Sequence, residues 1–162
     1  SSYGKVLDAA EKKFTLFFLL NYEKGKQAVK IEISKRRSTN IYEFKNYLGI
    51  SMLVIRQEDA TAGKLAALIT RKNFAIRDVF DTLYFLKNNW PINETVLKEK
   101  TGLSIEQVLK KALEKVAKIE KNQVLEGLGE LLDNKQKAWA KENLIKDTIF
   151  QLKLYRKNLE TK

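Results

Sequence analysis

The spacing of apolar and polar residues changes character near residue 57. Before that point, apolar residues gather in short runs that are typical of strands. An aromatic run from Phe14, a Gly-containing turn and a second apolar run predict a hairpin over residues 14–34. Residues 50–55 predict another strand, residues 41–47 are ambiguous, and residues 4–14 fit a short helix with its apolar side chains on one side.

After residue 57 the pattern becomes helical and stays so. Asp59 is a candidate N-cap for a helix over residues 60–71. A second helix is expected over residues 75–88, with apolar residues on one stripe. The segment that contains Pro91 should end it, because proline disfavours helix in the residue before it.

Strong local signals then mark three more helices and one weaker helix. Asn93 is an N-cap candidate for a helix that stops at Gly102. Capping boxes at residues 104–107 and 133–136 predict helices that reach about residue 119 and about residue 156. Residues 122–132 are expected to form a short helix between them.

This order of elements predicts an α+β fold. A small antiparallel or mixed sheet over about residues 14–55 would pack on a C-terminal helical bundle. We expect two lobes, residues 1–57 and 58–162, since no Pro- or Gly-rich linker divides the chain further.

Composition narrows the chemistry that the chain can perform. The chain has 162 residues, of which 44% are hydrophobic, so it can bury a core. It contains no histidine and no cysteine, which excludes disulfides, thiolate metal sites and histidine-based acid–base catalysis. The net charge of +11 favours polyanionic partners, although a solvated, lysine-rich surface accounts for it equally well. No apolar run approaches the roughly 20 residues that span a bilayer, so we expect a cytoplasmic protein without membrane contact.

Four charged residues stand in otherwise apolar helical sequence. Lys64 and Arg71 are seven residues apart, which places them on one helix face. Asp78 and Asp81 are three apart and are neighbours on the next helix. Charges in such surroundings must be paired or must face a polar cleft. They therefore indicate either a site for an anionic ligand or an ion cluster that holds two helices together.

Two further charged positions occur in the first lobe. Glu32 lies between two isoleucines on an expected strand, so it should point to the face opposite them. It is either an ordinary solvated residue or a catalytic or metal-binding carboxylate. Lys35, Arg36 and Arg37 form a basic loop that is either a solvated turn or a contact to a phosphate backbone.

Taken together, these segments resemble the AbiEii/AbiGii nucleotidyltransferase toxin family, within the polymerase-β-like nucleotidyltransferase superfamily. The resemblance covers most of the chain. Its motifs are Ile31-Glu32-Ile33, the segment from Glu58 to Leu65 with Thr61 and Lys64, then Arg71, and the segment Arg77-Asp78-Val79-Phe80-Asp81.

The resemblance implies that a complete protein transfers a nucleotide from an NTP with Mg²⁺ and acts as a toxin in a toxin–antitoxin or phage-defence system. By motif, Lys64, Arg71 and Thr61 would bind the NTP. Asp78, Asp81 and Glu32 would be catalytic, with Glu32 also holding metal. Some relatives are similar to enzymes that modify the 3′ end of tRNA, so tRNA and a cognate antitoxin are implied partners.

The sequence departs from the family pattern at its beginning. The family opens with Gly-Ser followed by Asp-x-Asp, and neither occurs in this chain. We therefore expect the chain to correspond to the rear two-thirds of such a protein and to be inactive alone. Two alternatives are a non-catalytic basic module that binds nucleic acid or a partner, and a structural helical domain.

Overall fold

The computed structural model describes residues 4–35, 39–72 and 74–161 and confirms the α+β class. The chain divides into two compact units, Ser1–Thr39 and Asn40–Lys162. The sequence predicts a boundary between two lobes at residues 57/58. This boundary stays a prediction, because the division into compact units does not define the lobes of the fold.

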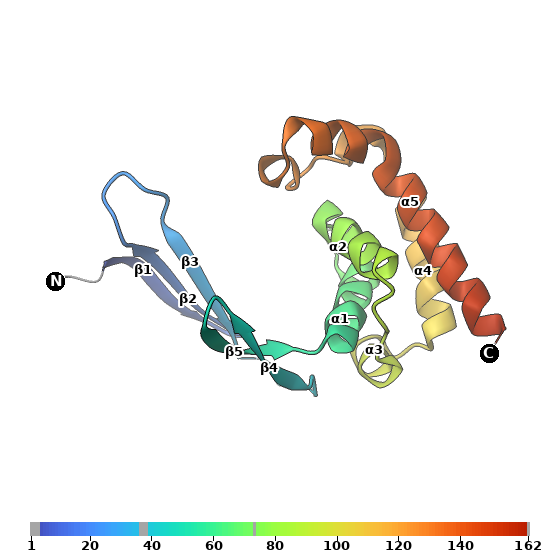
Figure 1. Cartoon of the computed structure of the whole chain (residues 1–162), viewed down its shortest axis with the longest axis horizontal. Coiled ribbons are helices and arrows are strands. Elements are labelled where there is room, and N and C mark those ends of the chain that lie inside the picture. Colours follow the sequence, from blue (N-terminus) through green and yellow to red (C-terminus); the bar gives the residue numbers. More distant parts are fainter. Residues whose placement is uncertain (1–3, 36–38, 73, 162) are drawn as a thin grey trace. The chain divides into compact units, whose positions relative to one another are not determined.

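The N-terminal unit is a three-stranded antiparallel sheet (Figure 1). Its strands β1 (Lys5–Lys12), β2 (Thr15–Asn21) and β3 (Val29–Ser34) follow one another in the order of the chain. The predicted hairpin over 14–34 is confirmed, but the helix expected over residues 4–14 is wrong. That segment pairs with β2 instead, because hydrogen bonds to a neighbouring strand outweigh a weak helical pattern.

Strand register separates the two faces of this sheet. Phe17 is opposite Glu32, whereas Phe18 is opposite Ile31 and Leu16 is opposite Ile33. Successive side chains of a strand alternate between faces. Glu32 therefore lies on the face opposite the two isoleucines, as predicted.

A second hairpin opens the C-terminal unit. Strands β4 (Tyr42–Tyr47) and β5 (Ile50–Ile55) form an antiparallel sheet of their own, so residues 14–55 make two small sheets rather than one. The ambiguous segment 41–47 is a strand. Leu48 and Gly49 join the strands with φ values of 50° and 81°, the left-handed pair that a tight hairpin turn requires.

The rest of this unit is helical, as predicted. The helices are α1 (Gln57–Thr70), α2 (Ile76–Lys87), α3 (Glu94–Thr101), α4 (Ile105–Val116) and α5 (Asn134–Glu160). The α-helix expected over residues 122–132 is wrong, because this segment contains only the 3₁₀ turns η1 (Lys121–Gln123) and η2 (Gly129–Leu131). Gly127 adopts a φ of 63° between them, which interrupts any continuous helix.

The predicted caps of the later helices are present. Asn93 accepts a hydrogen bond from the backbone N–H of Val96, and Gly102 ends α3 in the left-handed conformation. Capping boxes that begin at Ser104 and Asp133 open α4 and α5. Each cap satisfies N–H groups that have no partner within the helix, which fixes these boundaries locally.

Asp59 does not cap α1, contrary to the sequence prediction. The helix begins at Gln57 and Asp59 lies in its first turn, fully buried. Its two carboxylate oxygens accept hydrogen bonds from the backbone N–H of Ile41 at 2.5 Å and from Nδ2 of Asn93 at 2.6 Å. This carboxylate therefore joins the start of the second hairpin, α1 and the entry to α3.

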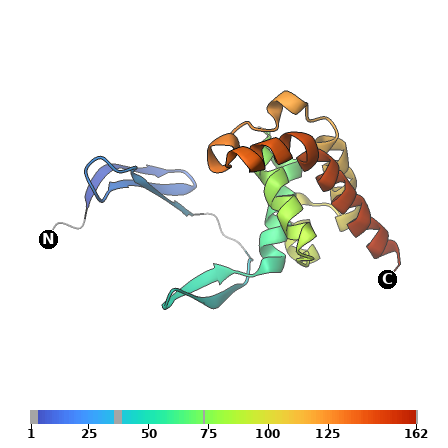
Figure 2. The same ribbon diagram turned by 45° about the horizontal axis from the view of Figure 1, so that its top comes forward.

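The core of the C-terminal unit lies among the five helices. Helix α1 packs against α2, α3 and α4, and α5 packs along α2 and α4 (Figure 1 and Figure 2). Fully buried leucines, including Leu65 on α1, Leu109 on α4 and Leu144 on α5, fill the space between them. In the part of the chain that the structure describes, no helix is both long and apolar enough to cross a membrane.

Candidate functional site

The four charged residues of the predicted site form one cluster at the junction of α1 and α2. Lys64 lies on α1, Arg71 follows its last turn, and Asp78 and Asp81 lie on α2. Lys64 Nζ is 2.5 Å from Asp81 Oδ2 and 3.5 Å from Asp78 Oδ1. Arg71 Nη1 is 2.6 Å from Asp78 Oδ2. The structure thus brings together residues that the sequence predicted to act together, and we call them the Lys64–Asp81 cluster.

Burial divides the cluster into an inner and an outer part. The Asp78 side chain is 1% exposed, whereas Lys64, Arg71 and Asp81 are 36%, 43% and 36% exposed. A buried carboxylate is costly unless cations and hydrogen bonds compensate it. The buried Asp78 carboxylate therefore holds Lys64 and Arg71 in position, while both of these cations reach solvent.

The outer cations retain capacity for an anionic ligand. Of the Arg71 guanidinium nitrogens, Nη1 is the one that contacts Asp78, and a guanidinium has five N–H donors. The Lys64 ammonium has three donors and faces two carboxylates. Arginine and lysine arranged in this way suit phosphate, the first as a planar fork and the second as a point charge.

Lys115 adds a cation that the sequence prediction missed. Its ammonium, on α4, donates to the backbone carbonyl oxygen of Arg71 at 3.4 Å. No local signal could have found it, since Lys115 is one of several lysines on α4 and lies 44 residues from Arg71. Its position depends on how α4 packs against α1.

Thr61 lies on the same helix as Lys64 but away from solvent. It is fully buried, and its hydroxyl donates to the carbonyl oxygen of Gln57 at 2.8 Å. This geometry favours a packing role for Thr61. Its expected contact to the NTP stays a prediction.

The remaining predicted residues belong to the N-terminal unit. Glu32 on β3 is exposed and pairs with Lys30 at 3.1 Å. Lys35 pairs with Glu11 at 2.5 Å, whereas Arg36 and Arg37 lie outside the described residues. The catalytic and metal-binding roles expected for Glu32, and the nucleic-acid contact expected for the basic loop, therefore stay predictions.

The described residues do not by themselves form a magnesium site. Across residues 4–35, 39–72 and 74–161, no group of three or more carboxylate, histidine or cysteine side chains lies close enough to hold a metal ion. Asp78 and Asp81 are neutralised by Lys64 and Arg71. Mg²⁺ prefers several oxygen ligands in octahedral geometry, which this cluster does not provide.

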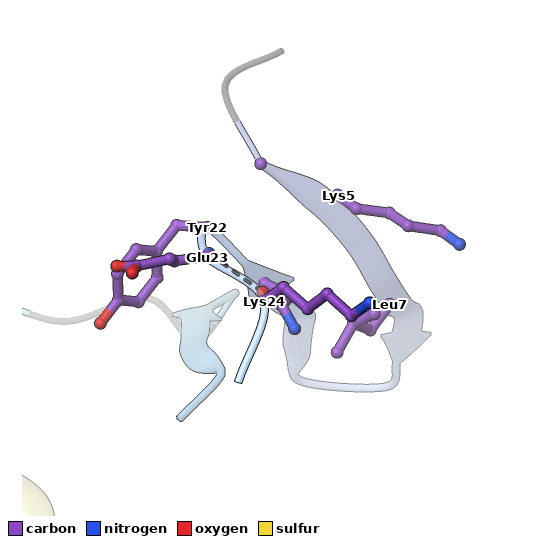
Figure 3. Close-up of a pocket in the computed structure, with 7 residues that line it drawn as sticks. Lys5, Leu7, Tyr22, Glu23 and Lys24 are labelled. Atoms are coloured by element: carbon purple, nitrogen blue, oxygen red, sulfur yellow. Dashed lines mark hydrogen bonds between the residues drawn. The ribbon is translucent and has the colours of Figure 1, made fainter. Parts of the chain in front are cut away.

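A hollow of about 530 Å³ lies at one end of the N-terminal sheet, beside the turn after β2 (Figure 3). Figure 3 shows Lys24 extending beside Leu7, with Tyr22 and Glu23 on the other side of the turn. The dashed line marks the hydrogen bond from the Glu23 N–H to Asn21 Oδ1. The charged groups around this hollow do not converge, so it is not a candidate site.

Solved structures show which class of fold this is. A candidate nucleotidyltransferase from H. pylori matches 99% of this chain and 70% of its own, with 17% identity and a TM-score of 0.61. JHP933 from Helicobacter pylori matches 99% of this chain and 68% of its own, with 16% identity and a TM-score of 0.59. The chain thus has a nucleotidyltransferase-like α+β fold.

The sequence defines the family more narrowly. The family described as nucleotidyl transferase AbiEii toxin, type IV TA system, matches residues 4–149, and the chain belongs to it. Membership in a type IV toxin–antitoxin system implies an antitoxin as partner. Among curated protein sequences, none matches the chain significantly.

Proposed function

We propose that this chain is the part of a nucleotidyltransferase toxin that binds the triphosphate of an NTP, for transfer of the nucleotide to an acceptor RNA. The 3′ end of tRNA is the acceptor that we expect. The observation that carries the proposal is the pairing of Lys64 and Arg71 with one buried carboxylate, Asp78. Such transfer depends mainly on positioning and on charge neutralisation, and it requires neither histidine nor cysteine.

Each member of the Lys64–Asp81 cluster has a distinct role in this proposal. Lys64 and Arg71 contact phosphate oxygens, and Asp78 holds both cations in place from its buried position. Lys64 also forms a salt bridge with the partly exposed Asp81 in the free protein. Phosphate binding therefore moves the Lys64 ammonium from the Asp81 carboxylate to the ligand. The electrostatic stabilisation of a bound phosphate is largest where the cations are already fixed, because little reorganisation is then required.

Metal chemistry would have to come from residues outside this cluster. Mg²⁺ would supply neutralisation of the phosphates when bound, with Glu32 as one expected carboxylate and an Asp-x-Asp pair as the others. This sequence contains no Asp-x-Asp and no Gly-Ser pair. We therefore propose that the chain alone does not transfer nucleotides. We also propose that the complete protein acts in the cytoplasm, where NTP and tRNA are available.

The test is transfer of label from each of the four α-³²P-labelled NTPs to total tRNA in the presence of Mg²⁺. It compares the chain alone with the complete gene product that contains it. Label transferred by the complete product alone supports the proposal. If the complete, folded product transfers no label to tRNA or to other RNA, the proposal is wrong.

A non-catalytic RNA-binding module is the second candidate. The net charge of +11 and the missing Asp-x-Asp favour it. It predicts RNA binding that weakens steeply with salt, because neutralised phosphates release counterions. Measuring the dissociation constant for tRNA from low to high salt in the absence of NTP tests it. Affinity that stays constant over that range contradicts it.

A further inference from the structure

A cavity of about 280 Å³ opens between the loop after α2 and the C-terminal part of α5. Its lining includes the apolar residues Leu86, Pro91 and Leu159 and the amides of Asn89 and Asn158. Trp90 and Tyr155 supply aromatic rings. The volume is at the lower end of ligand pockets, so the cavity suits one planar ring rather than a whole nucleotide.

Trp90 is held rigidly beside this cavity. Its ring stacks on that of Phe85, with centroids 4.4 Å apart and planes 10° apart. Tyr84 approaches the Trp90 ring edge-on at 5.9 Å. An aromatic side chain fixed by two neighbours loses little conformational entropy when a ligand stacks on it. Trp90 is therefore a preorganised aromatic residue in the lining of this cavity.

Tyr155 lines the same cavity. Burial raises the pKa of Tyr155 and the nearby Glu94 carboxylate raises it further, while a backbone hydrogen bond with Ile92 acts in the opposite direction. The raised pKa means that the surroundings of Tyr155 favour the neutral phenol.

The polar groups around the cavity match the edge of a nucleobase. Each of the Asn89 and Asn158 side-chain amides carries both donors and an acceptor, as a base edge does.

We propose that this cavity receives one unpaired base of a single-stranded RNA, stacked on Trp90 and read by Asn89 and Asn158. Stacking on aromatic side chains combined with hydrogen bonds to base edges is how proteins recognise single-stranded RNA. The strongly basic charge of the chain favours RNA, which is a polyanion, over a neutral or basic partner. The inference rests on the proposed function, because it assigns a binding site for the acceptor RNA to the C-terminal unit.

The first experiment follows the fluorescence of Trp90. The chain has two tryptophans, so the Trp139→Phe variant leaves Trp90 as the only one. This variant is titrated with a single-stranded 12-nucleotide RNA and with the corresponding duplex, without NTP. Saturable quenching by the single strand and not by the duplex supports the proposal. Unchanged Trp90 fluorescence while the RNA binds, measured by anisotropy of a labelled strand, overturns it.

The second experiment uses two variants with the same change of charge on one helix. Asn158→Asp puts a carboxylate in the cavity, and Asn134→Asp puts one at the first residue of α5, far along the helix. We expect Asn158→Asp to weaken binding of the single strand about tenfold more than Asn134→Asp does, because a carboxylate in the cavity removes an amide donor and repels the bound nucleotide, and one bound base contributes roughly that factor. Equal effects of both variants, or no RNA binding by the wild type, overturn the proposal.

Neither experiment depends on nucleotide transfer. If the protein transfers no label but shows Trp90 quenching and the Asn158 effect, the proposed transfer function is wrong and the base site is supported. If it transfers label but shows neither effect, the transfer function is supported and the base site is wrong. Circular dichroism of each variant checks that the helices are intact.

Discussion

Arg71 Nη1 lies 2.6 Å from Asp78 Oδ2, although 43% of the arginine side chain is exposed and only 1% of the aspartate. The same carboxylate also faces Lys64 through its other oxygen, at 3.5 Å. One buried acidic group therefore fixes two cations that reach the surface. This relationship has consequences for stability as well as for ligand binding, because the two functions depend on the same atoms.

Asp78→Asn should destabilise the protein by about 2–3 kcal/mol, since it removes the charge that compensates two neighbouring cations and leaves a buried amide. Asp147→Asn is the matched control. Asp147 pairs with Lys87 at 2.8 Å but is one-third exposed, so its loss should cost no more than about 1 kcal/mol. Urea unfolding of both variants measures the difference. Equal costs would show that burial of Asp78 has no energetic consequence.

Lys64→Gln should lower transfer by the complete protein at least about 100-fold, because it removes one fixed cation from the phosphate site. Arg71 would still compensate Asp78, so the fold should survive. Lys111→Gln, at an exposed position on α4, removes the same charge elsewhere and should change transfer little. Steady-state rates of labelled NTP transfer test this, and a fully active Lys64→Gln enzyme would remove Lys64 from the site.

Asn93→Asp should destabilise the protein by about 2 kcal/mol, although Asp is as good an N-cap as Asn. The Asn93 amide donates to Asp59 at 2.6 Å while its oxygen caps α3. An aspartate at position 93 still caps α3, but its carboxylate lies beside that of Asp59. The buried Asp59 carboxylate also loses the hydrogen bond that the Asn93 amide donates.

Asp133→Asn, the reverse exchange at the N-cap of α5, is the control and should be nearly neutral. Thermal and urea unfolding of both variants measure the difference. If Asn93→Asp is as stable as the wild type, the hydrogen bond to Asp59 does not hold the hairpin and helices together.

Tyr155→Phe should make stability less sensitive to alkaline pH. The pKa of Tyr155 in the folded protein is raised above its ordinary value of 10.0. The neutral phenol is thus favoured in the folded state, so its contribution is complete below about pH 10 and is lost as pH rises through the folded pKa. The variant should lose less stability above pH 10 than the wild type. Tyr47→Phe, at an exposed hairpin position, should behave as the wild type does in the same series of urea curves.

The caps of the later helices and the residues of the charged cluster could be predicted from the sequence. Asn93, Ser104 and Asp133 bind N–H groups of their own helix within three residues, so short-range spacing determines them. The members of the Lys64–Asp81 cluster were also predictable, because helical spacing places Lys64 and Arg71 on one face and makes Asp78 and Asp81 neighbours. Which cation meets which carboxylate depended on the packing of α2 against α1.

Other features depend on partners far away in the chain. Residues 5–12 carry a helix-like pattern yet form β1, since β2 supplies their hydrogen bonds. Asp59 resembles an N-cap yet is a buried acceptor for Ile41 and Asn93, which lie 18 and 34 residues away. The cavity between Trp90 and Tyr155 likewise exists only where α5 returns to the end of α2. Sequence alone determined what neighbouring residues can satisfy among themselves, whereas tertiary structure decided which distant groups meet, because only packing brings them within bonding distance.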